Sequence, residues 1–184
     1  EFRRVLFRSL PALNLESEAG ILVSVPTKIL QNQIMQEEGQ RLKEVFHLEI
    51  HSLKGPQNYL KLDAFHQVLH RPESNRLFTR FKMQLLIWLT ETETGDLDEI
   101  GQLYRYQHFL PELVHDGKLS KKSLFATEDF WKRGQEKAKT SRVLLTNHAY
   151  LVTRLEDNPE FVDNGLLILD EAQKMLRSEE HTSE

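Results

Sequence analysis

Two adjacent carboxylates directly follow a short apolar run near the end of the chain. Residues 166–169 are Leu, Leu, Ile and Leu, and Asp170 and Glu171 come next. Such a run favours a buried central strand of a parallel sheet, and these sheets bind ligands beyond the carboxyl ends of their strands. Asp170 could there hold a hydrated Mg²⁺ on nucleotide phosphates, and Glu171 could orient or deprotonate an attacking water. The pattern is that of a Walker B strand, although a strand that ends in two solvated acids fits it equally well.

A nucleotide site also needs a loop that cradles phosphates. The usual pattern, Gly-x-x-x-x-Gly-Lys-Ser/Thr, does not occur in the sequence. Gly117 and Lys118 are followed by Leu119, and no glycine stands five positions before Gly117. Either the protein is not an ATPase, or its phosphate loop lies before Leu10.

The two ends of the chain do not read as natural termini. One DNA string encodes residues 1–9, and the start of its reverse complement encodes residues 177–184. This string resembles a sequencing-library adapter, and chance is the alternative explanation. We therefore expect both segments to be foreign and leave them out of the fold prediction. The native stretch is then about 10–176, cut from a longer parent protein.

Strand and helix patterns alternate in the first and last parts of this stretch. Short apolar, β-branched runs predict strands, and apolar residues at helical spacing predict helices. In chain order these are a strand at 21–25, a helix from Thr27, a strand at 47–52, a strand at 142–146, a helix at 149–155 and a strand at 166–169. Strand, helix, strand is the unit of a parallel α/β sheet.

The middle of the chain carries helical periodicity without strand patterns. Residues 59–69 and 76–89 are predicted helices. The expected core face of the second consists of Leu77, Phe81, Leu85 and Trp88. We therefore predict one α/β domain, at 10–55 and 142–176, that is split by a helical insertion at 56–141.

Composition and charge narrow the class of protein. The 184 residues include 24 Lys and Arg against 28 Asp and Glu, and 39% are hydrophobic, which suits a globular fold. The chain has no cysteine for disulfides or cluster ligation, and no apolar run approaches the roughly 20 residues of a membrane span. We expect a cytoplasmic protein with no membrane partner. Because the net charge is -4, any nucleic acid must be held by a local basic patch.

Four blocks of sequence carry a family resemblance. They are residues 23–33 (VSVPTKILQNQ), 53–60 (LKGPQNYL), 144–149 (LLTNHA) and 167–173 (LILDEAQ). In this order they resemble the DinG/XPD family of superfamily 2 DNA helicases, and most of all the DinG type of low-GC Gram-positive bacteria, which is often fused to a DnaQ-like exonuclease. The resemblance implies part of a RecA-like P-loop NTPase domain, ATP and Mg²⁺ as cofactors, single-stranded DNA as a partner, and a second RecA-like domain in the parent. It also implies movement in the 5′-to-3′ direction.

The resemblance assigns the acidic site residues. Asp170 and Glu171 match the family's motif II, which implies a water-mediated contact of Asp170 with Mg²⁺ and a catalytic role for Glu171. Gln173 stands where many members carry His, so the coupling role of that position is open.

The resemblance also assigns nucleic-acid contacts. Pro26, Thr27 and Lys28 match motif Ia, which is expected to contact the phosphate backbone of single-stranded DNA. The alternative for Thr27 is a plain helix N-cap. Asn147 and His148 match a second block near the DNA path, and again the alternative is that they cap the next helix.

Lys61 departs from the pattern of part of the family. In iron–sulfur members a cluster-ligating Cys follows the block that resembles residues 54–60, and here Lys61 follows it. We therefore predict a variant without an iron–sulfur cluster, whose insertion is held by apolar packing. The packing residues would be Phe65, Leu69, Phe78, Phe81 and Trp88.

Two further patterns have simple explanations. Residues 118–142 hold eight basic side chains against three acidic ones, with aromatic residues between them. This segment predicts either a groove for single-stranded nucleic acid or a solvated helix pair. His66 and His70 have the spacing of a zinc-binding pair, but Gln67 replaces the usual Glu and no third ligand is evident, which favours two ordinary helix-face histidines.

The predicted function is therefore a fragment of an ATP-dependent DNA helicase that acts in DNA repair or replication. The fragment alone is expected to be inactive, because the phosphate loop and the second motor domain lie outside it. The rival hypothesis is a non-catalytic nucleic-acid or protein-binding module with a degenerate ATPase fold. In that case Asp170 and Glu171 form only a polar strand end.

Overall fold

The computed structural model describes residues 20–118, 123–157 and 165–175. The segments predicted to derive from an adapter, 1–9 and 177–184, lie outside the described residues, as does part of the basic segment, 119–122.

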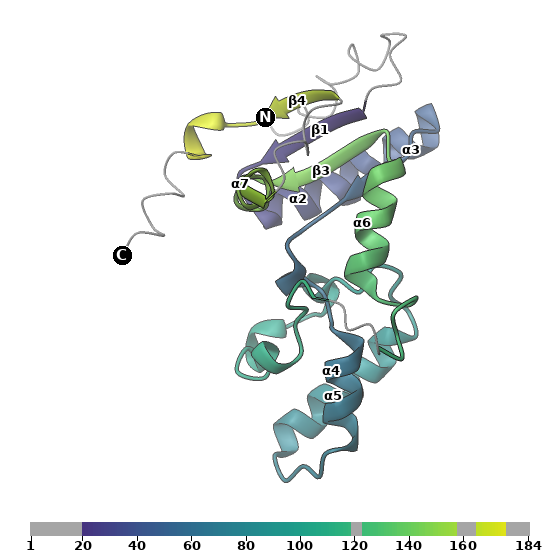
Figure 1. Ribbon diagram of the computed structural model, residues 1–184, viewed down its shortest axis with the longest axis vertical. Helices are drawn as coiled ribbons and strands as arrows, with labels where there is room; N and C mark the ends of the chain where they lie inside the picture. The colour runs from purple at the N-terminus through teal and green to yellow at the C-terminus, as the bar shows by residue number, and fades with distance from the viewer. Residues whose placement is uncertain (1–19, 119–122, 158–164, 176–184) are drawn as a thin grey trace. The chain divides into compact units, whose positions relative to one another are not determined.

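The chain divides into two units, whose helices and strands are drawn in Figure 1. The first consists of the described parts of Glu1–Lys54 and Lys137–Glu184, and the second is Gly55–Glu136. The domain limits proposed from the sequence stay a prediction. In the part of the chain that the structure describes, no helix has the length and apolar character needed to cross a membrane.

The first unit is built on a four-stranded sheet. Its strands are β1 (Gly20–Val25), β2 (Ile50–Ser52), β3 (Val143–Asn147) and β4 (Gly165–Leu169), in the spatial order β2-β3-β1-β4. Every pair is parallel, and Val23 of β1 lies between Leu145 and Ile168 of its two neighbours. The predicted α/β class, with a parallel sheet of the RecA-like or Rossmann type, is confirmed.

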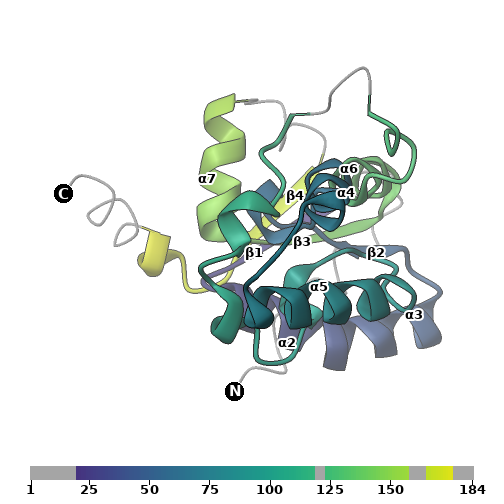
Figure 2. The ribbon, with the colours of Figure 1, turned by 90° about the horizontal axis from the view of Figure 1, so that it is seen from below.

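Helices cover both faces of this sheet. α2 (Lys28–Ile34) continues through a π-helical segment (Met35–Gly39) into α3 (Gln40–Phe46), and α7 (His148–Asp157) lies on the opposite face (Figure 2). The predicted start of the first helix is confirmed, because the Thr27 hydroxyl accepts a hydrogen bond from the Leu30 amide at 3.2 Å. The sequence did not indicate the π-helical interruption.

The alternation of side chains along β1 separates the two faces of the sheet. Ile21, Val23 and Val25 pack in one core with residues of α2, α3, β2 and β3. Ser24 points the other way and meets His148 at the start of α7. The remaining buried members of the core are Leu30, Ile34, Leu42, Ile50, Val143 and Leu145. Because β1 is buried on both faces, it sets the direction of the residues that follow Val25.

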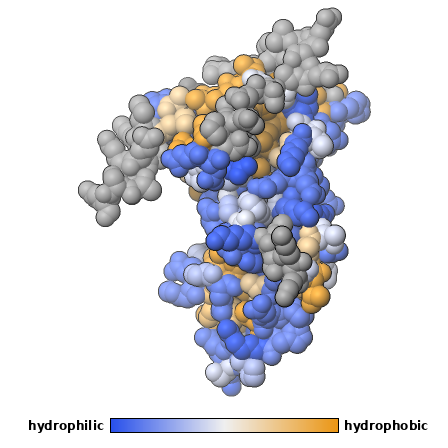
Figure 3. Space-filling model, viewed as in Figure 1, coloured by the Kyte–Doolittle hydropathy of each residue, from blue (hydrophilic) through white to orange (hydrophobic). Residues whose placement is uncertain are grey.

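β4 differs from the buried central strand that the sequence predicts. It lies at the edge of the described sheet, and Leu166 and Leu169 are 44% and 37% exposed. Figure 3 shows hydrophobic side chains gathered over the strands of this unit. The prediction was wrong for the described residues, because an apolar run indicates that a strand is suited to burial but not which residues cover it. Among these residues, only β1 pairs with β4.

The second unit is helical. It contains α4 (Leu62–His70), α5 (Arg76–Leu89) and the first part of α6 (Phe130–Thr140), with short 3-10 turns at Pro56–Asn58, Leu97–Glu99, Leu103–Tyr106 and Leu110–Glu112. The predicted apolar packing is confirmed: Phe65, Phe78, Phe81 and Trp88 are buried in one core, and Leu69 packs against it.

One residue, Leu77, was wrongly predicted to lie on the core face of α5. Leu77 is 41% exposed, and Phe78 takes its place in the core. The two residues flank the same apolar stripe of α5 from opposite sides, so the helical period fits both. Stacking of Phe78 on Phe109, with ring centroids 4.3 Å apart, selects Phe78.

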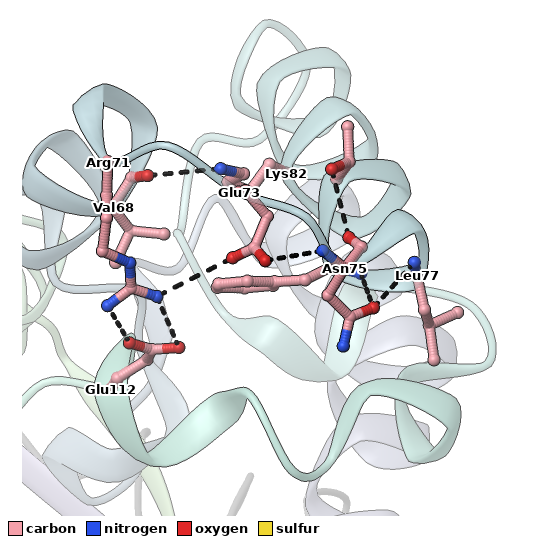
Figure 4. A network of polar contacts seen from close by, with 9 residues as sticks. Val68, Arg71, Glu73, Asn75, Leu77, Lys82 and Glu112 are labelled. Carbon is pink, nitrogen blue, oxygen red and sulfur yellow. Dashed lines mark hydrogen bonds and ion pairs between the residues drawn. The ribbon is translucent and has the colours of Figure 1, made fainter.

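A polar network closes the turn between α4 and α5 (Figure 4). Arg71 donates two hydrogen bonds to the Glu112 carboxylate, at 3.1 and 3.4 Å, and lies 3.9 Å from Glu73. The Glu73 carboxylate accepts a hydrogen bond from the Asn75 backbone amide, and the Asn75 side chain caps the first turn of α5. These contacts fix the residue at which α5 begins.

Candidate functional site

Three of the predicted segments meet at one edge of the sheet. β1, β3 and β4 are adjacent and parallel, so their carboxyl ends lie side by side. Residues 26–28 follow β1, His148 follows β3, and the acid pair follows β4. Open α/β sheets bind ligands at this edge. Residues predicted from separate parts of the sequence are therefore neighbours in the fold.

Asp170 and Glu171 stand at the start of the loop after β4, and both side chains are half-buried. The Asp170 amide donates to the Ser24 carbonyl at 2.9 Å, which extends the β1–β4 ladder by one residue. Glu171 has φ 51° and ψ 47°, a left-handed conformation that is uncommon for a residue other than glycine. Its carboxylate forms an ion pair with Lys174, and Gln173 is exposed in the same turn.

The donor chemistry of this acid pair fits Mg²⁺. Magnesium prefers oxygen ligands and keeps several waters, so one or two half-buried carboxylates are a suitable set. Among residues 20–118, 123–157 and 165–175, no cluster of three or more His, Asp or Glu side chains is arranged to hold a metal ion. His66 and His70 lie with ring centroids 4.4 Å apart, and the Nδ1 atom of His70 is 2.8 Å from the His66 carbonyl.

Asn147 is buried, and both ends of its side-chain amide are used inside the protein. Its Oδ1 accepts a hydrogen bond from the Tyr150 amide at 3.0 Å, which caps α7. Its Nδ2 donates to the Gln31 Oε1 at 2.9 Å. The helix-cap interpretation therefore describes its place in the fold, and a direct contact with DNA stays a prediction.

His148 is also buried, with 2% of its surface exposed. Its Nδ1 lies 2.8 Å from the Ser24 hydroxyl, and its Nε2 lies 2.9 Å from the Asp170 carbonyl. Burial lowers the pKa of His148, because desolvation outweighs the raising effect of the Asp170 carbonyl and of the Asp170 and Glu171 charges. The imidazole is therefore neutral at neutral pH, and its contact with DNA stays a prediction.

Residues 26–28 have a different environment. Pro26 is half-buried, and Thr27 and Lys28 are exposed at the start of α2. Thr27 acts as the N-cap of the helix, as the simpler interpretation predicts. Because its side chain is exposed at the edge described above, a phosphate contact remains compatible with the cap.

Sequence reasoning missed two residues that hold this edge together. Gln31 is fully buried, and its amide nitrogen donates to the carbonyls of Leu53 and Leu145 at 3.0 and 3.1 Å. Ser24 is fully buried within an otherwise apolar strand and contacts His148. For Ser24 the available signal was a polar residue within an apolar run, whereas the helical pattern gave none for Gln31.

Several known proteins that bear one name are similar to this chain. No family model matches the chain. The chain is 30% identical over 168 residues to a protein of Staphylococcus saprophyticus named 3'-5' exonuclease DinG, and 31% identical over 167 residues to a Bacillus subtilis protein of the same name. These matches cover 88% and 89% of this chain, and a Staphylococcus aureus protein of that name is 27% identical over 88% of it. The chain spans 18% of the length of each of these relatives. Over most of its length, it is therefore similar to one stretch of proteins named DinG.

Proposed function

We propose that this chain is part of the first motor domain of an ATP-dependent DNA helicase of the DinG/XPD family. The observation that carries the proposal is the meeting of the acid pair and the exposed segment at Lys28 on the ligand-binding edge of one parallel sheet. The parent protein would couple Mg-ATP hydrolysis to movement along single-stranded DNA and to unwinding, in DNA repair or replication.

The proposed nucleotide site is centred on the acid pair. Asp170 would hold a hydrated Mg²⁺, which would neutralise phosphate charge, and Glu171 would orient or deprotonate the attacking water. Gln173 is exposed in the same turn, and a role for it in relaying the state of the nucleotide is part of the proposal. We propose that the phosphate loop precedes Leu10 in the parent and that a second RecA-like domain completes the site.

The proposed DNA contact is made by the residues after β1. Thr27 and Lys28 are exposed, and a hydroxyl and an ammonium are common partners of phosphate oxygens. Pro26 ends the strand and sets the direction of these side chains. Asn147 and His148 are buried, and they join β3 and the start of α7 to α2 and to the acid pair.

The name of these relatives, 3'-5' exonuclease DinG, adds a nuclease to the proposal. The match covers 18% of those proteins, which leaves room for further domains. We propose that the parent of this chain carries a fused 3'-5' exonuclease in a separate domain and that the acid pair described here serves ATP.

We also propose that the parent has no iron–sulfur cluster. Lys61, at the position where iron–sulfur members carry Cys, lies 2.7 Å from the Asp116 carboxylate. This hydrogen bond lowers the pKa of Asp116. The Lys61 amide donates to the Leu113 carbonyl, so the position is joined to the same part of the unit by backbone and side chain. The purified parent is expected to lack visible iron–sulfur absorption, and bound iron with that absorption would overturn this part of the proposal.

The test of the proposal is ATP hydrolysis by the parent protein, with and without single-stranded DNA. Asp170→Asn and Glu171→Gln are each expected to reduce kcat by about 100-fold or more, because one removes the carboxylate that holds the hydrated Mg²⁺ and the other removes the group that activates water. Glu44→Gln is the matched control, since Glu44 is an exposed acid on α3. It is expected to hydrolyse ATP as the wild type does.

The same assay separates the rival function. A parent that binds DNA but does not hydrolyse ATP would be a non-catalytic binding module, and the helicase proposal would be rejected. Genomic DNA that encodes no phosphate loop before Leu10 would reject it as well.

A further inference from the structure

We propose that His148 is a positioning residue, which fixes the peptide between Asp170 and Glu171 and so aims the acid pair. This inference rests on the proposed function of that pair. It differs from the DNA contact that the sequence predicts for His148, because both ring nitrogens face the protein interior.

The two contacts of His148 define its tautomer. A carbonyl oxygen only accepts hydrogen bonds, so Nε2, at 2.9 Å from the Asp170 carbonyl, must carry the proton. In the neutral ring Nδ1 is then an acceptor, and the Ser24 hydroxyl at 2.8 Å donates to it. The ring is thus oriented from both sides.

These contacts close a ring of hydrogen bonds around Asp170. The Asp170 backbone amide donates to the Ser24 carbonyl at 2.9 Å, and the Asp170 carbonyl accepts a hydrogen bond from the His148 Nε2. The His148 Nδ1 in turn accepts a hydrogen bond from the Ser24 hydroxyl, which closes the ring. Both backbone groups of Asp170 are therefore held, one by β1 and the other by the first residue of α7. All of these residues belong to the first unit.

The next residue shows why the carbonyl must be held. Glu171 adopts φ 51° and ψ 47°, which persists in a non-glycine residue only when the surroundings impose it. On one side of Glu171, its carbonyl accepts a hydrogen bond from the Lys174 amide at 2.8 Å. On the other side, His148 fixes the carbonyl of the preceding peptide. Without that donor the peptide can rotate, and both carboxylates lose their direction.

Two substitutions of His148 test whether its hydrogen bond to the Asp170 carbonyl matters, or only the volume of its side chain. In His148→Gln, the side-chain amide nitrogen reaches about as far as Nε2 and can still donate to the Asp170 carbonyl. In His148→Asn, the shorter amide reaches only the Ser24 side. In the parent protein, the His148→Asn variant is expected to lower kcat for ATP hydrolysis by about 10- to 100-fold, with a smaller change in KM. The His148→Gln variant is expected to keep most of the wild-type kcat. Equal losses in both variants would overturn the proposal.

A second readout uses this chain and needs no nucleotide. Nitrogen-15 NMR of His148 is expected to show the proton on Nε2, and amide exchange at Asp170 is expected to be faster in His148→Asn than in His148→Gln. An Nε2 atom without a proton in the wild type would overturn the proposal, whether or not the variants fold.

The two proposals fail in different ways. If the NMR results are as expected and the parent hydrolyses no ATP, the proposed function is wrong and the ring of hydrogen bonds remains as described. If the parent is active and His148→Asn equals the wild type, the positioning role is wrong.

Discussion

At the scale of single residues, Asp129 caps α6 and lies next to a buried histidine. Its Oδ1 accepts the Lys132 amide at 2.9 Å, and its Oδ2 lies 3.1 Å from the His115 Nε2. The Gly117 amide donates to the His115 Nδ1, so the neutral ring carries its proton on the side of Asp129. Burial raises the pKa of Asp129, but the contacts with His115 and with the Lys132 amide lower it by more, and the net pKa is lowered.

This lowered pKa makes stability depend on pH. The unfolded pKa of Asp is about 3.9, so the stabilisation is fully present above that value and is lost as pH falls through the lower folded pKa. Asp129→Asn keeps a helix cap but removes the charge. It is expected to unfold more easily than the wild type by about 1 kcal/mol at neutral pH, and this difference should shrink below about pH 4.

Urea unfolding at several pH values measures this difference. Glu93→Gln, an exposed acid in the same unit, is the control and should show no such pH dependence. A destabilisation of Asp129→Asn that is equal at all pH values would mean that the charge of Asp129 does not contribute.

At the scale of elements, the local sequence pattern predicts where helices and strands begin and end, because local interactions determine those limits. The strands and helices of the first unit lie within three residues of their predicted limits, apart from the π-helical segment, and α5 has the predicted limits. Contacts between distant residues leave no such pattern. Asn147 and Gln31 are 116 positions apart, and the conformation of Glu171 depends on contacts made by Ser24 and His148. The candidate site was therefore predicted as a set of segments, whereas the inward direction of Asn147 and His148 was not.

The face that α5 buries can be tested with two residues of this helix. Phe81 is fully buried and stacks on Tyr106, with ring centroids 4.3 Å apart. Phe81→Ala is expected to cost about 3–5 kcal/mol of stability, because it leaves a cavity in a packed core. Leu77→Ala is expected to cost less than about 1 kcal/mol, since Leu77 is 41% exposed and lies outside the buried core. Urea unfolding compares the two, and similar costs would contradict the assigned face.

At the scale of the whole molecule, the net charge of -4 means that any bound DNA must be held by a local basic patch. The basic residues of α6 do not form one stripe. Lys132 and Lys139 are seven positions apart and share a face, whereas Arg133 and Lys137 are four apart and share another. Lys132 also donates to the Ala126 carbonyl at 3.3 Å. This arrangement favours the solvated-helix interpretation over a groove.

The salt dependence of binding to single-stranded DNA separates the two basic regions. Each phosphate contact contributes about 0.7 to the slope of log affinity against log salt concentration for a single strand, because it releases a bound counterion. Lys28→Gln is therefore expected to weaken binding and to reduce this slope by about 0.7. Lys139→Gln removes the same charge from α6 and is expected to leave the slope unchanged. Fluorescence anisotropy between about 50 and 200 mM salt measures both variants. Equal reductions of the slope in both variants would show that binding depends on the basic charge of both regions. An unchanged slope for Lys28→Gln would show that Lys28 does not contact a phosphate.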